Sequence, residues 1–439
     1  MKNRLTRRRF VRTSAGLVAL AANPYWRTGR ARADESKNER PLIGAIGLGG
    51  QGTGDARRAS EYGEIVAVCD VQRQHAERAK EKHFNKAEIH EDYRKLLDRK
   101  DIEAVTIGTP DHWHTEIALA ALEAGKHVYC EKPLTLTIDE GKQLVAAVKK
   151  SGKVMQVGTQ QRGDQPELFG RAVATVRGGH LGKIKKVTVQ LPLSTEEGGP
   201  FAVQPVPDGL NWDFWLGQAA NADYCPERCH SRFRWWYEYS GGICTDWGAH
   251  HMDVAHWALD VENSGPLSID GTHTKLPEIP GAFNTPKLVT VDFMYPGDIH
   301  LQLIAQPPGD EGVLFEGETG RIFVNRGRIT GKPIAEQDAD TKLKESIMAD
   351  VEKLYKGNTA KMGDHMGNFF EAWKYDKWPI SDVASQHRSV SACHLANISI
   401  RLKRKLAWDA AKEVFIGDTE ADSMLTRAQR DPYKIRSAG

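Results

Sequence analysis

Short apolar segments alternate with amphipathic segments along the first part of the chain, from residue 41 to residue 159. The apolar segments have the length of strands, and residues 111–124 and 138–150 repeat apolar positions with helical spacing. Strands and helices in this order predict a doubly wound parallel sheet, which binds ligands at the carboxyl ends of its strands. The expected strands lie at residues 42–46, 64–70, 103–108, 127–132 and 153–158.

The rest of the chain, residues 160–439, has a different pattern. Apolar and polar residues alternate through residues 267–274, 287–306 and 312–327, with Gly and Pro at the turns, which predicts an antiparallel meander. A polar connector is expected near residues 331–344, and a long helical pattern covers residues 382–406. A length of 439 residues also suits at least two domains with cores of their own.

The first 33 residues differ from both domains. Paired arginines in "TRRRFVR" precede an apolar segment at residues 15–22 and a small-residue "ARA" that ends at Ala33. This order predicts a twin-arginine signal peptide over residues 1–33, a linker over residues 34–40 and a periplasmic protein. A basic tail with an accidental apolar patch is the alternative.

Charge and hydropathy exclude two classes of partner. The predicted signal holds nine basic residues and no acidic one, so its removal changes the formal net charge from +2 to −7. A mildly acidic chain lacks the basic surface that binds nucleic acid. No segment approaches the roughly 18 consecutive apolar residues of a membrane span.

A glycine-rich turn follows the first expected strand. Gly47-x-Gly49-x-x-Gly52 opens a helical segment, and the next strand ends in an acid at Asp70. Such a turn lets the backbone approach a pyrophosphate at a helix N-terminus, and the acid binds the adenosine ribose. Asp70 favours NAD over NADP, although the nearby Arg73 could accommodate a 2′-phosphate. The turn also contains Gly50 and Gln51.

Polar residues follow the ends of the later strands. Lys132 stands at the rim where the nicotinamide ring would lie, and the rigid Pro133 after it fixes the turn. An ammonium there can stabilise a developing alkoxide during hydride transfer. A lysine that only extends out of a strand end is the structural alternative. The residues expected to bind the cofactor at this rim are Thr109, Pro110, His112, His114, Glu131, Lys132 and Gln160.

These motifs make the chain similar to a known family. The glycine turn, "TPDHWH", "EKP" and the later "SGGICTDWGAHHMD" resemble the glucose-fructose oxidoreductase, inositol dehydrogenase and rhizopine catabolism protein family (Gfo/Idh/MocA). The resemblance covers residues 41–439. It implies an NAD-binding Rossmann domain (residues 41–159), a second α/β domain with a large, mostly antiparallel open sheet (residues 160–439), and a homodimer or homotetramer.

The last motif supplies two further catalytic candidates. Gly241, Gly242, Asp246, Gly248, His250 and Asp253 fit the family pattern. Asp246 and His250 are four residues apart, so on one helix the aspartate would orient the histidine as a base for a hydroxyl proton. By resemblance, Lys132, Asp246 and His250 face the nicotinamide.

Aromatic and cysteine residues complete the prediction for the second domain. Arg228, His230 and Asn211 stand among many aromatic residues, a mixture that suits a sugar, so Arg228 and His230 join Lys132, Asp246 and His250 as substrate-binding candidates. We expect one or two of four tryptophans, Trp212, Trp215, Trp235 and Trp236, to line the pocket. The spacing of Cys225, Cys229 and Cys244 matches no tetrahedral zinc site, so no metal is expected. A disulfide between Cys225 and Cys229 stays open, and Cys69, Cys130 and Cys393 are expected in the core.

Three functions remain possible. The first is an oxidoreductase that acts on a CH–OH group of a sugar or polyol and retains its cofactor, since the periplasm offers no free nicotinamide pool. The second is an NAD-dependent glycoside hydrolase that works by transient oxidation and elimination, although the known aminosugar-cleaving group lacks "EKP". The third, a non-catalytic sugar-binding protein, is disfavoured by the intact Lys132, Asp246 and His250. The sequence does not identify the sugar or glycoside.

Overall fold

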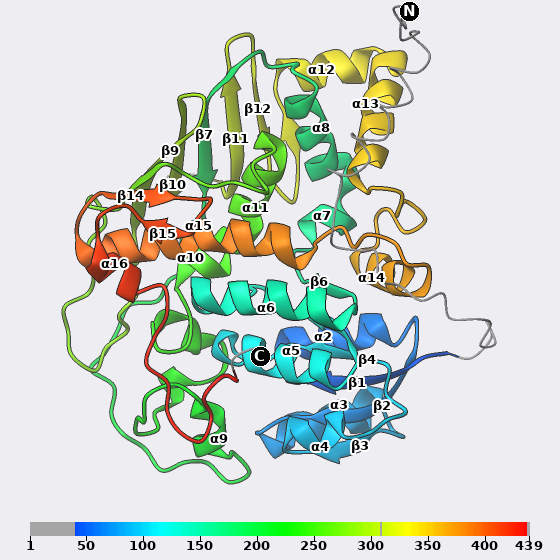
Figure 1. The fold of residues 1–439 in the computed structure, drawn as a ribbon, viewed down its shortest axis with the longest axis vertical. Coiled ribbons are helices and arrows are strands. Elements are labelled where there is room, and N and C mark those ends of the chain that lie inside the picture. The colour runs from blue at the N-terminus through cyan, green and yellow to red at the C-terminus, as the bar shows by residue number, and fades with distance from the viewer. Residues whose placement is uncertain (1–39, 308–309, 437–439) are drawn as a thin grey trace, which may run out of the picture.

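Two α/β units, each built on its own sheet, make up the computed structural model, which describes residues 40–307 and 310–436. The expected signal peptide and most of the linker lie outside the described residues. In Figure 1 the first unit, coloured blue to cyan, lies below the second. Both expected sheets are confirmed.

The first sheet has six strands in the order β3-β2-β1-β4-β5-β6, and all of its paired neighbours are parallel. The short polar strand β3 at its edge was not predicted, because a three-residue "EIH" carries no apolar pattern. The strands are β1 (Leu42–Ile46), β2 (Glu64–Cys69), β3 (Glu88–His90), β4 (Ala104–Ile107), β5 (His127–Cys130) and β6 (Met155–Val157). The helices are α2 (Gly50–Ala59), α3 (Arg73–His83), α4 (Tyr93–Leu97), α5 (Asp111–Glu123) and α6 (Ile138–Ser151).

The second sheet has nine strands in the order β13-β12-β11-β7-β10-β9-β8-β14-β15. Its paired neighbours are antiparallel except β7 and β10, which run parallel. The strands are β7 (Ile184–Gln190), β8 (Ser268–Asp270), β9 (Val289–Tyr295), β10 (Ile299–Ala305), β11 (Gly312–Gly317), β12 (Arg321–Val324), β13 (Ile329–Thr330), β14 (Leu406–Asp409) and β15 (Val414–Phe415).

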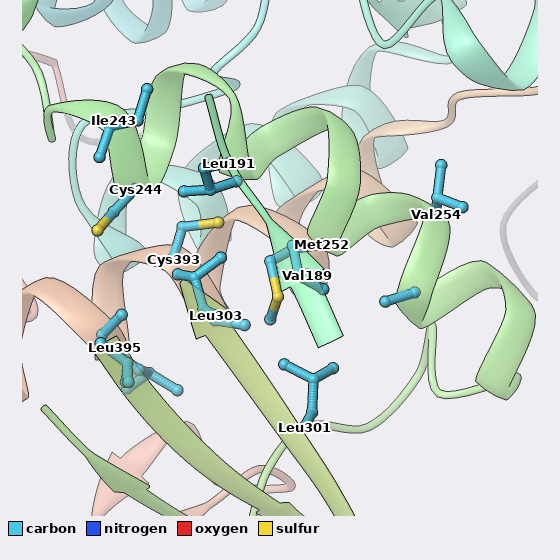
Figure 2. Close-up of a cluster of buried hydrophobic side chains, with 14 of the residues drawn as sticks. Val189, Leu191, Ile243, Cys244, Met252, Val254, Leu301, Leu303, Cys393 and Leu395 are labelled. Carbon is cyan, nitrogen blue, oxygen red and sulfur yellow. The ribbon is translucent and has the colours of Figure 1, made fainter. Parts of the chain in front are cut away.

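Helices cover one face of this sheet and bury its apolar side chains. They include α8 (Arg171–Arg177), α10 (Ile243–Asp246), α11 (Gly248–Leu259) and α15 (Val383–Leu402). Figure 2 shows Met252 of α11 and Cys393 of α15 gathered with Val189, Leu301 and Leu303 of the sheet. The inward-facing apolar residues of "KLVTVDFMY" (residues 287–295) are therefore buried by helices of the same chain. Their alternation with polar residues does not itself require a partner subunit.

Several short elements complete the structure. The connector expected near residues 331–344 is helical instead, because Pro333 at a first helical turn and Asp340 as an N-cap start two helices there. These are α12 (Lys332–Ala339) and α13 (Thr341–Leu354). The others are α7 (Gln161–Asp164), α9 (Trp212–Leu216), α14 (His365–Lys374), α16 (Thr419–Ser423), one π-helical turn (Pro166–Gly170) and two 3₁₀ turns (Pro226–Arg228, His230–Trp235).

The two units are joined by more than the chain between them. Helix α15 of the second unit packs along α6 of the first, and Figure 1 shows the pair crossing the middle of the molecule. The chain end then returns to the first unit, where the Tyr433 ring lies 6.0 Å from the Trp113 ring and the Arg436 amide donates to Glu116 Oε2 at 3.2 Å. No helix among the described residues has the length and hydrophobicity to cross a membrane.

Candidate active site

The glycine turn after β1 has the form of a phosphate-binding loop. Gly47 has φ +80°, and a Cβ there would meet the Thr109 nitrogen at 2.5 Å. A Cβ at Gly52 would lie 1.9 Å from the Gly47 oxygen, so these two positions need glycine for packing. Gly49 and Gly50 face open space instead, and α2 begins at Gly50 without a side-chain cap. The uncapped N–H groups and the open space fit a pyrophosphate.

Asp70 stands at the carboxyl end of β2, where the fold would hold an adenosine ribose. Its Oδ2 accepts from the Leu48 amide at 2.7 Å and its Oδ1 from the Gln72 amide at 2.8 Å. His75 Nδ1 is 3.4 Å from Oδ2, and the His230 ring of the second unit lies 5.9 Å from the His75 ring. The carboxylate is therefore held in place, and residues of both units surround this end of the site.

One cleft of about 520 Å³ runs from Asp70 to His250 between the two units. Most of the expected cofactor-binding residues line it, which brings positions from five strand ends together. They are Gly47, Gly49, Gly50, Gln51, Asp70, Thr109, Pro110, Glu131, Lys132 and Gln160. Of the four tryptophans weighed for the pocket, Trp215 lines the cleft.

Four expected cofactor-binding residues do not line this cleft, and one of them is Gly52, which is required for packing against Gly47. Arg73 points to solvent and pairs with Glu77 at 2.6 Å, and Arg78 lines the cleft in its place. His112 is buried, its Nε2 donates to the Trp215 carbonyl at 2.9 Å, and burial lowers its pKa to about 3.

His114 is likewise buried and lies outside the cleft lining. Its two ring nitrogens contact the carbonyls of Thr109 at 2.9 Å and Pro133 at 2.8 Å. His114 therefore links the turns after β4 and β5. It supports the wall of the cleft without lining it.

A cluster of charges lies where the two units meet. The Nζ of Lys132 donates to Asp246 Oδ1 at 2.6 Å and to the Asp246 carbonyl at 2.9 Å. Arg234 Nε donates to the same Oδ1 at 3.1 Å. Burial alone would raise the pKa of Asp246, but the two cations outweigh burial and lower that pKa to about 2. The carboxylate therefore stays charged and holds the lysine at the cleft.

His250 lines the cleft, but Asp246 does not orient its ring. The helix is interrupted at Trp247, between α10 and α11, so Asp246 and His250 do not share one helix. Among the described residues the buried Nδ1 of His250 has no hydrogen-bond partner. Burial lowers the pKa of His250 well below its usual value, and the positive charges of Lys132 and Arg326 add to this effect. The ring is therefore neutral near pH 7 and can accept a proton.

A pair of carboxyl groups lies below the phosphate loop. Gln51 Nε2 donates to Asp55 Oδ1 at 3.0 Å and to Glu131 Oε1 at 3.3 Å, and Gln160 Nε2 donates to Glu131 Oε1 at 2.6 Å. Burial and the neighbouring Glu131 raise the pKa of Asp55 well above its usual value. Asp55 therefore keeps a proton where an exposed aspartate would have lost it.

Three further residues singled out from the sequence do not take part in the cluster of Lys132, Asp246 and Arg234. Asp253 is fully buried and forms a bidentate ion pair with Arg162, at 2.6 Å for each contact. Arg228 does not line the cleft, and its guanidinium lies 3.9 Å from the centre of the Trp236 ring. His230 does line the cleft, although at the Asp70 end and not beside Lys132.

The cysteines that were considered as zinc ligands or as a disulfide are buried free thiols. Cys69, Cys130 and Cys393 are buried core residues, as expected. Cys225 and Cys229 are also buried free thiols. In the part of the chain that the structure describes, no cluster of three or more His, Cys, Asp or Glu side chains is arranged to hold a metal ion.

Several cleft residues had not been singled out from the sequence. Arg234 lies between Phe233 and Trp235 in an aromatic-rich stretch, and Arg326 lies in the strand pattern of residues 312–327; both reach the site through the fold of the second unit. A weak signal existed for Trp247, since it lies inside the "TDWGAHH" motif. The other unassigned lining residues include His75, Arg78, Trp113 and Asp111.

Comparison with known families gives two matches on this chain. Residues 42–159 match the description "Oxidoreductase family, NAD-binding Rossmann fold". Residues 197–435 match the description "Oxidoreductase family, C-terminal alpha/beta domain" of the same Gfo/Idh/MocA group. Together the two matches cover most of the chain and, of the strands in the two sheets, leave out only β7.

Three known proteins illustrate the similarity. Inositol 2-dehydrogenase of Salmonella typhimurium is 37% identical over 126 residues, which cover 28% of this chain and 38% of that enzyme. Glycosyl hydrolase family 109 protein 1 of Shewanella sp. strain MR-4 is 34% identical over 172 residues, 34% of this chain and 38% of that protein. The WlbA dehydrogenase of Bordetella pertussis, solved with NADH and UDP-GlcNAcA, aligns with TM-score 0.60 at 16% identity over 85% of this chain and 99% of its own.

Proposed function

Because the chain belongs to the Gfo/Idh/MocA oxidoreductase family, we propose that it is an NAD-dependent dehydrogenase of a sugar or polyol hydroxyl. The observation that carries this proposal is the contact of Lys132 with Asp246 at the cleft, next to His250. The similarity to inositol 2-dehydrogenase supports a polyhydroxylated substrate, although the aligned part is 38% of that enzyme.

The residues of the cleft fit NAD. The phosphate loop would hold the pyrophosphate at the N-terminus of α2, Asp70 would bind the adenosine ribose, and Glu131 would line the nicotinamide end. When bound, NAD supplies a hydride acceptor. The carboxylate of Asp70 favours NAD over NADP, whereas Arg73 points outward and Arg78 is the arginine that lines the cleft.

The side chains of this chain divide the remaining chemistry. Lys132 would lie against the substrate hydroxyl, and its ammonium would stabilise negative charge on that oxygen. Neutral His250 would accept the hydroxyl proton. Asp246 positions Lys132 by accepting its hydrogen bond. Arg234 donates to the same carboxylate, so the three side chains together carry one net positive charge.

A panel experiment tests this function. The purified protein is loaded with NAD and mixed with inositols, aldoses and sugar acids, while reduced nicotinamide is followed by absorbance. Reduction by at least one polyhydroxy compound, lost in Lys132→Ala, supports the proposal. No reduction by any compound, with NAD shown to be bound, would contradict it.

NAD-dependent glycoside hydrolysis is a second candidate, because a family 109 glycosyl hydrolase is 34% identical over 172 residues. In this reaction the hydroxyl is oxidised, the neighbouring acidic proton is lost, the glycosidic oxygen is eliminated, water adds, and the hydride returns. The same protein is mixed with aryl glycosides. Release of the aryl alcohol without net NAD reduction would favour hydrolysis over dehydrogenation.

Export and a retained cofactor form a separate part of the proposal. The paired arginines before an apolar segment at residues 15–22 support export by the twin-arginine route. We expect the protein in the periplasmic fraction, with NAD released on denaturation. A periplasmic protein whose denatured supernatant contains no NAD would contradict retention, and NADP there would contradict the role of Asp70. The oligomeric state, a dimer or tetramer by resemblance, is measured by light scattering on the same sample.

A further inference from the structure

An arginine of the second unit stands beside the proposed reaction centre. Arg326 lines the cleft together with Trp247 and His250. Its guanidinium lies 4.5 Å from the centre of the Trp247 ring, and the Trp247 and His250 rings are 6.1 Å apart. A substrate whose hydroxyl meets Lys132 and His250 would therefore extend within reach of Arg326.

The backbone around Arg326 is held in place. Asn325 Oδ1 accepts from the amides of Gly327 and Arg328, at 2.9 Å each, which closes a tight turn between β12 and β13. Gln165 Nε2 donates to the Arg326 carbonyl at 2.9 Å. With its amide turned to satisfy both of its ends, Gln161 accepts from Arg326 Nε at 3.2 Å and donates to the His250 carbonyl at 3.0 Å. Arg326 is thus a fixed part of the cleft wall.

Arg326 differs from the other cations near the reaction centre in its charge balance. Lys132 and Arg234 share the carboxylate of Asp246. Within the described residues, Arg326 has no carboxylate within 4.0 Å, and the nearby Glu311 pairs with His251 at 2.9 Å. Burial accordingly lowers the pKa of Arg326. Arg326 therefore has no ion-pair partner among the described residues, and only the more distant carboxylates of Glu311, Glu131 and Asp246 offset part of its charge.

Arg328, two residues along the same turn, provides the contrast. It pairs with Asp310 and lies 5.4 Å from the centre of the Phe323 ring, away from the cleft. The turn therefore carries one arginine with a local ion pair and one without. A substrate group is the natural partner for the second.

We propose that Arg326 binds a carboxylate of the substrate, so that the hydroxyl oxidised at Lys132 belongs to a sugar acid. The proposal rests on the proposed dehydrogenase function. The planar guanidinium can hold a carboxylate by two parallel hydrogen bonds, and the stacking on Trp247 leaves its edge available. Lys132 and Arg234 are directed at Asp246, so Arg326 is the cation left to donate to a substrate anion, and its two parallel hydrogen bonds match the two oxygens of a carboxylate.

Matched ligands test this assignment on the NAD-loaded protein. The pairs are glucuronate with glucose and galacturonate with galactose, with glucose 6-phosphate as the phosphate probe. Calorimetry gives the dissociation constants. We expect one acid to bind about 10- to 100-fold more tightly than its neutral counterpart, the range of a charged hydrogen bond. The ratio should fall toward one in Arg326→Gln and only partly in Arg326→Lys, while the control Arg328→Gln keeps it.

Three results would overturn the assignment. They are no preference for an acid in the wild type, a preference that persists in Arg326→Gln, and tighter binding of glucose 6-phosphate than of either acid. Turnover is measured separately, so the two proposals can fail independently. An acid preference that depends on Arg326, without any reduction of NAD, would support the carboxylate site and contradict the dehydrogenase.

Discussion

The Nζ of Lys132 lies 2.6 Å from Oδ1 of Asp246, so a lysine of the first unit and an aspartate of the second form an ion pair across the domain junction. Both side chains are largely buried. An isolated ammonium there would be costly, and the carboxylate compensates it. The pair explains how the chain can keep a positively charged lysine at the end of a buried strand.

Asp246→Asn tests the positioning role of this carboxylate. We expect hydride transfer to slow by less than in Lys132→Ala, because the lysine remains but loses its fixed direction. An Asp246→Asn protein that transfers hydride at the wild-type rate would contradict the role. Asp350→Asn, in an exposed ion pair with Lys353, is the control.

His250 should act as a neutral base over the physiological range. Its pKa is lowered, so the acid limb of kcat/KM should lie below pH 6.5, the ordinary value for histidine. The charges of Lys132, Arg326, His251 and His365 all lower this pKa. Arg326→Gln should therefore move the acid limb to higher pH, whereas an unchanged limb would show that another group titrates.

The same base can be removed directly. His250→Ala should slow hydride transfer roughly 10²- to 10⁴-fold, the usual contribution of a general base, with part of the loss recovered at high pH. Single-turnover rates across pH provide the measurement. A loss that does not depend on pH would argue that His250 only shapes the cleft.

Asp55→Asn should raise stability at alkaline pH. The folded protein raises the pKa of Asp55, so the stabilising contribution is complete below the unfolded value near 4 and is lost as pH rises through the folded value. Asparagine keeps the hydrogen bond from Gln51 without a charge beside Glu131. We expect a gain on the order of 1 kcal/mol at pH 8 that shrinks toward pH 4. Urea unfolding at the two pH values measures it, and a gain that grows toward acid would contradict the assignment.

Asp253→Ala should destabilise the fold without a direct effect on the reaction. The variant removes the bidentate partner of the buried Arg162 and leaves its ion pair with Glu262 at 2.7 Å, so we expect a cost of about 1.5–3 kcal/mol, the range of hydrogen bonds to a charged group. Asp350→Ala, which breaks an exposed pair, should cost at most about 1 kcal/mol. Denaturant midpoints compare the two. Equal midpoints would mean that Arg162 finds other partners.

Local motifs account for the part of the site that could be predicted from the sequence. The turn from Gly47 to Gly52, Asp70 and Lys132 all follow strand ends, and a parallel sheet brings strand ends to one edge. The apolar pattern also located β1, β4 and α5 closely. These features depend on neighbours in the sequence.

Contacts between distant segments could not be predicted in this way. Arg234 and Arg326 reach the cleft only because the second sheet and its loops fold against the first unit, and nothing in their local sequence indicates it. The spacing of Asp246 and His250 suggested one helix, but the helix is interrupted at Trp247, and the partner of Asp246 is Lys132 instead. Strand β7 lies within a polar context, "IKKVTVQ", and was also missed.

The single-turnover rate of Lys132→Ala tests the central claim most directly. NAD-loaded wild type and variant are mixed with a substrate found in the panel, and nicotinamide reduction is followed in time, with Lys86→Ala as a surface control. We expect the variant to retain NAD and to transfer hydride about 10²- to 10³-fold more slowly, the cost of losing an electrostatic stabiliser. Reduction at the wild-type rate by Lys132→Ala would contradict the account.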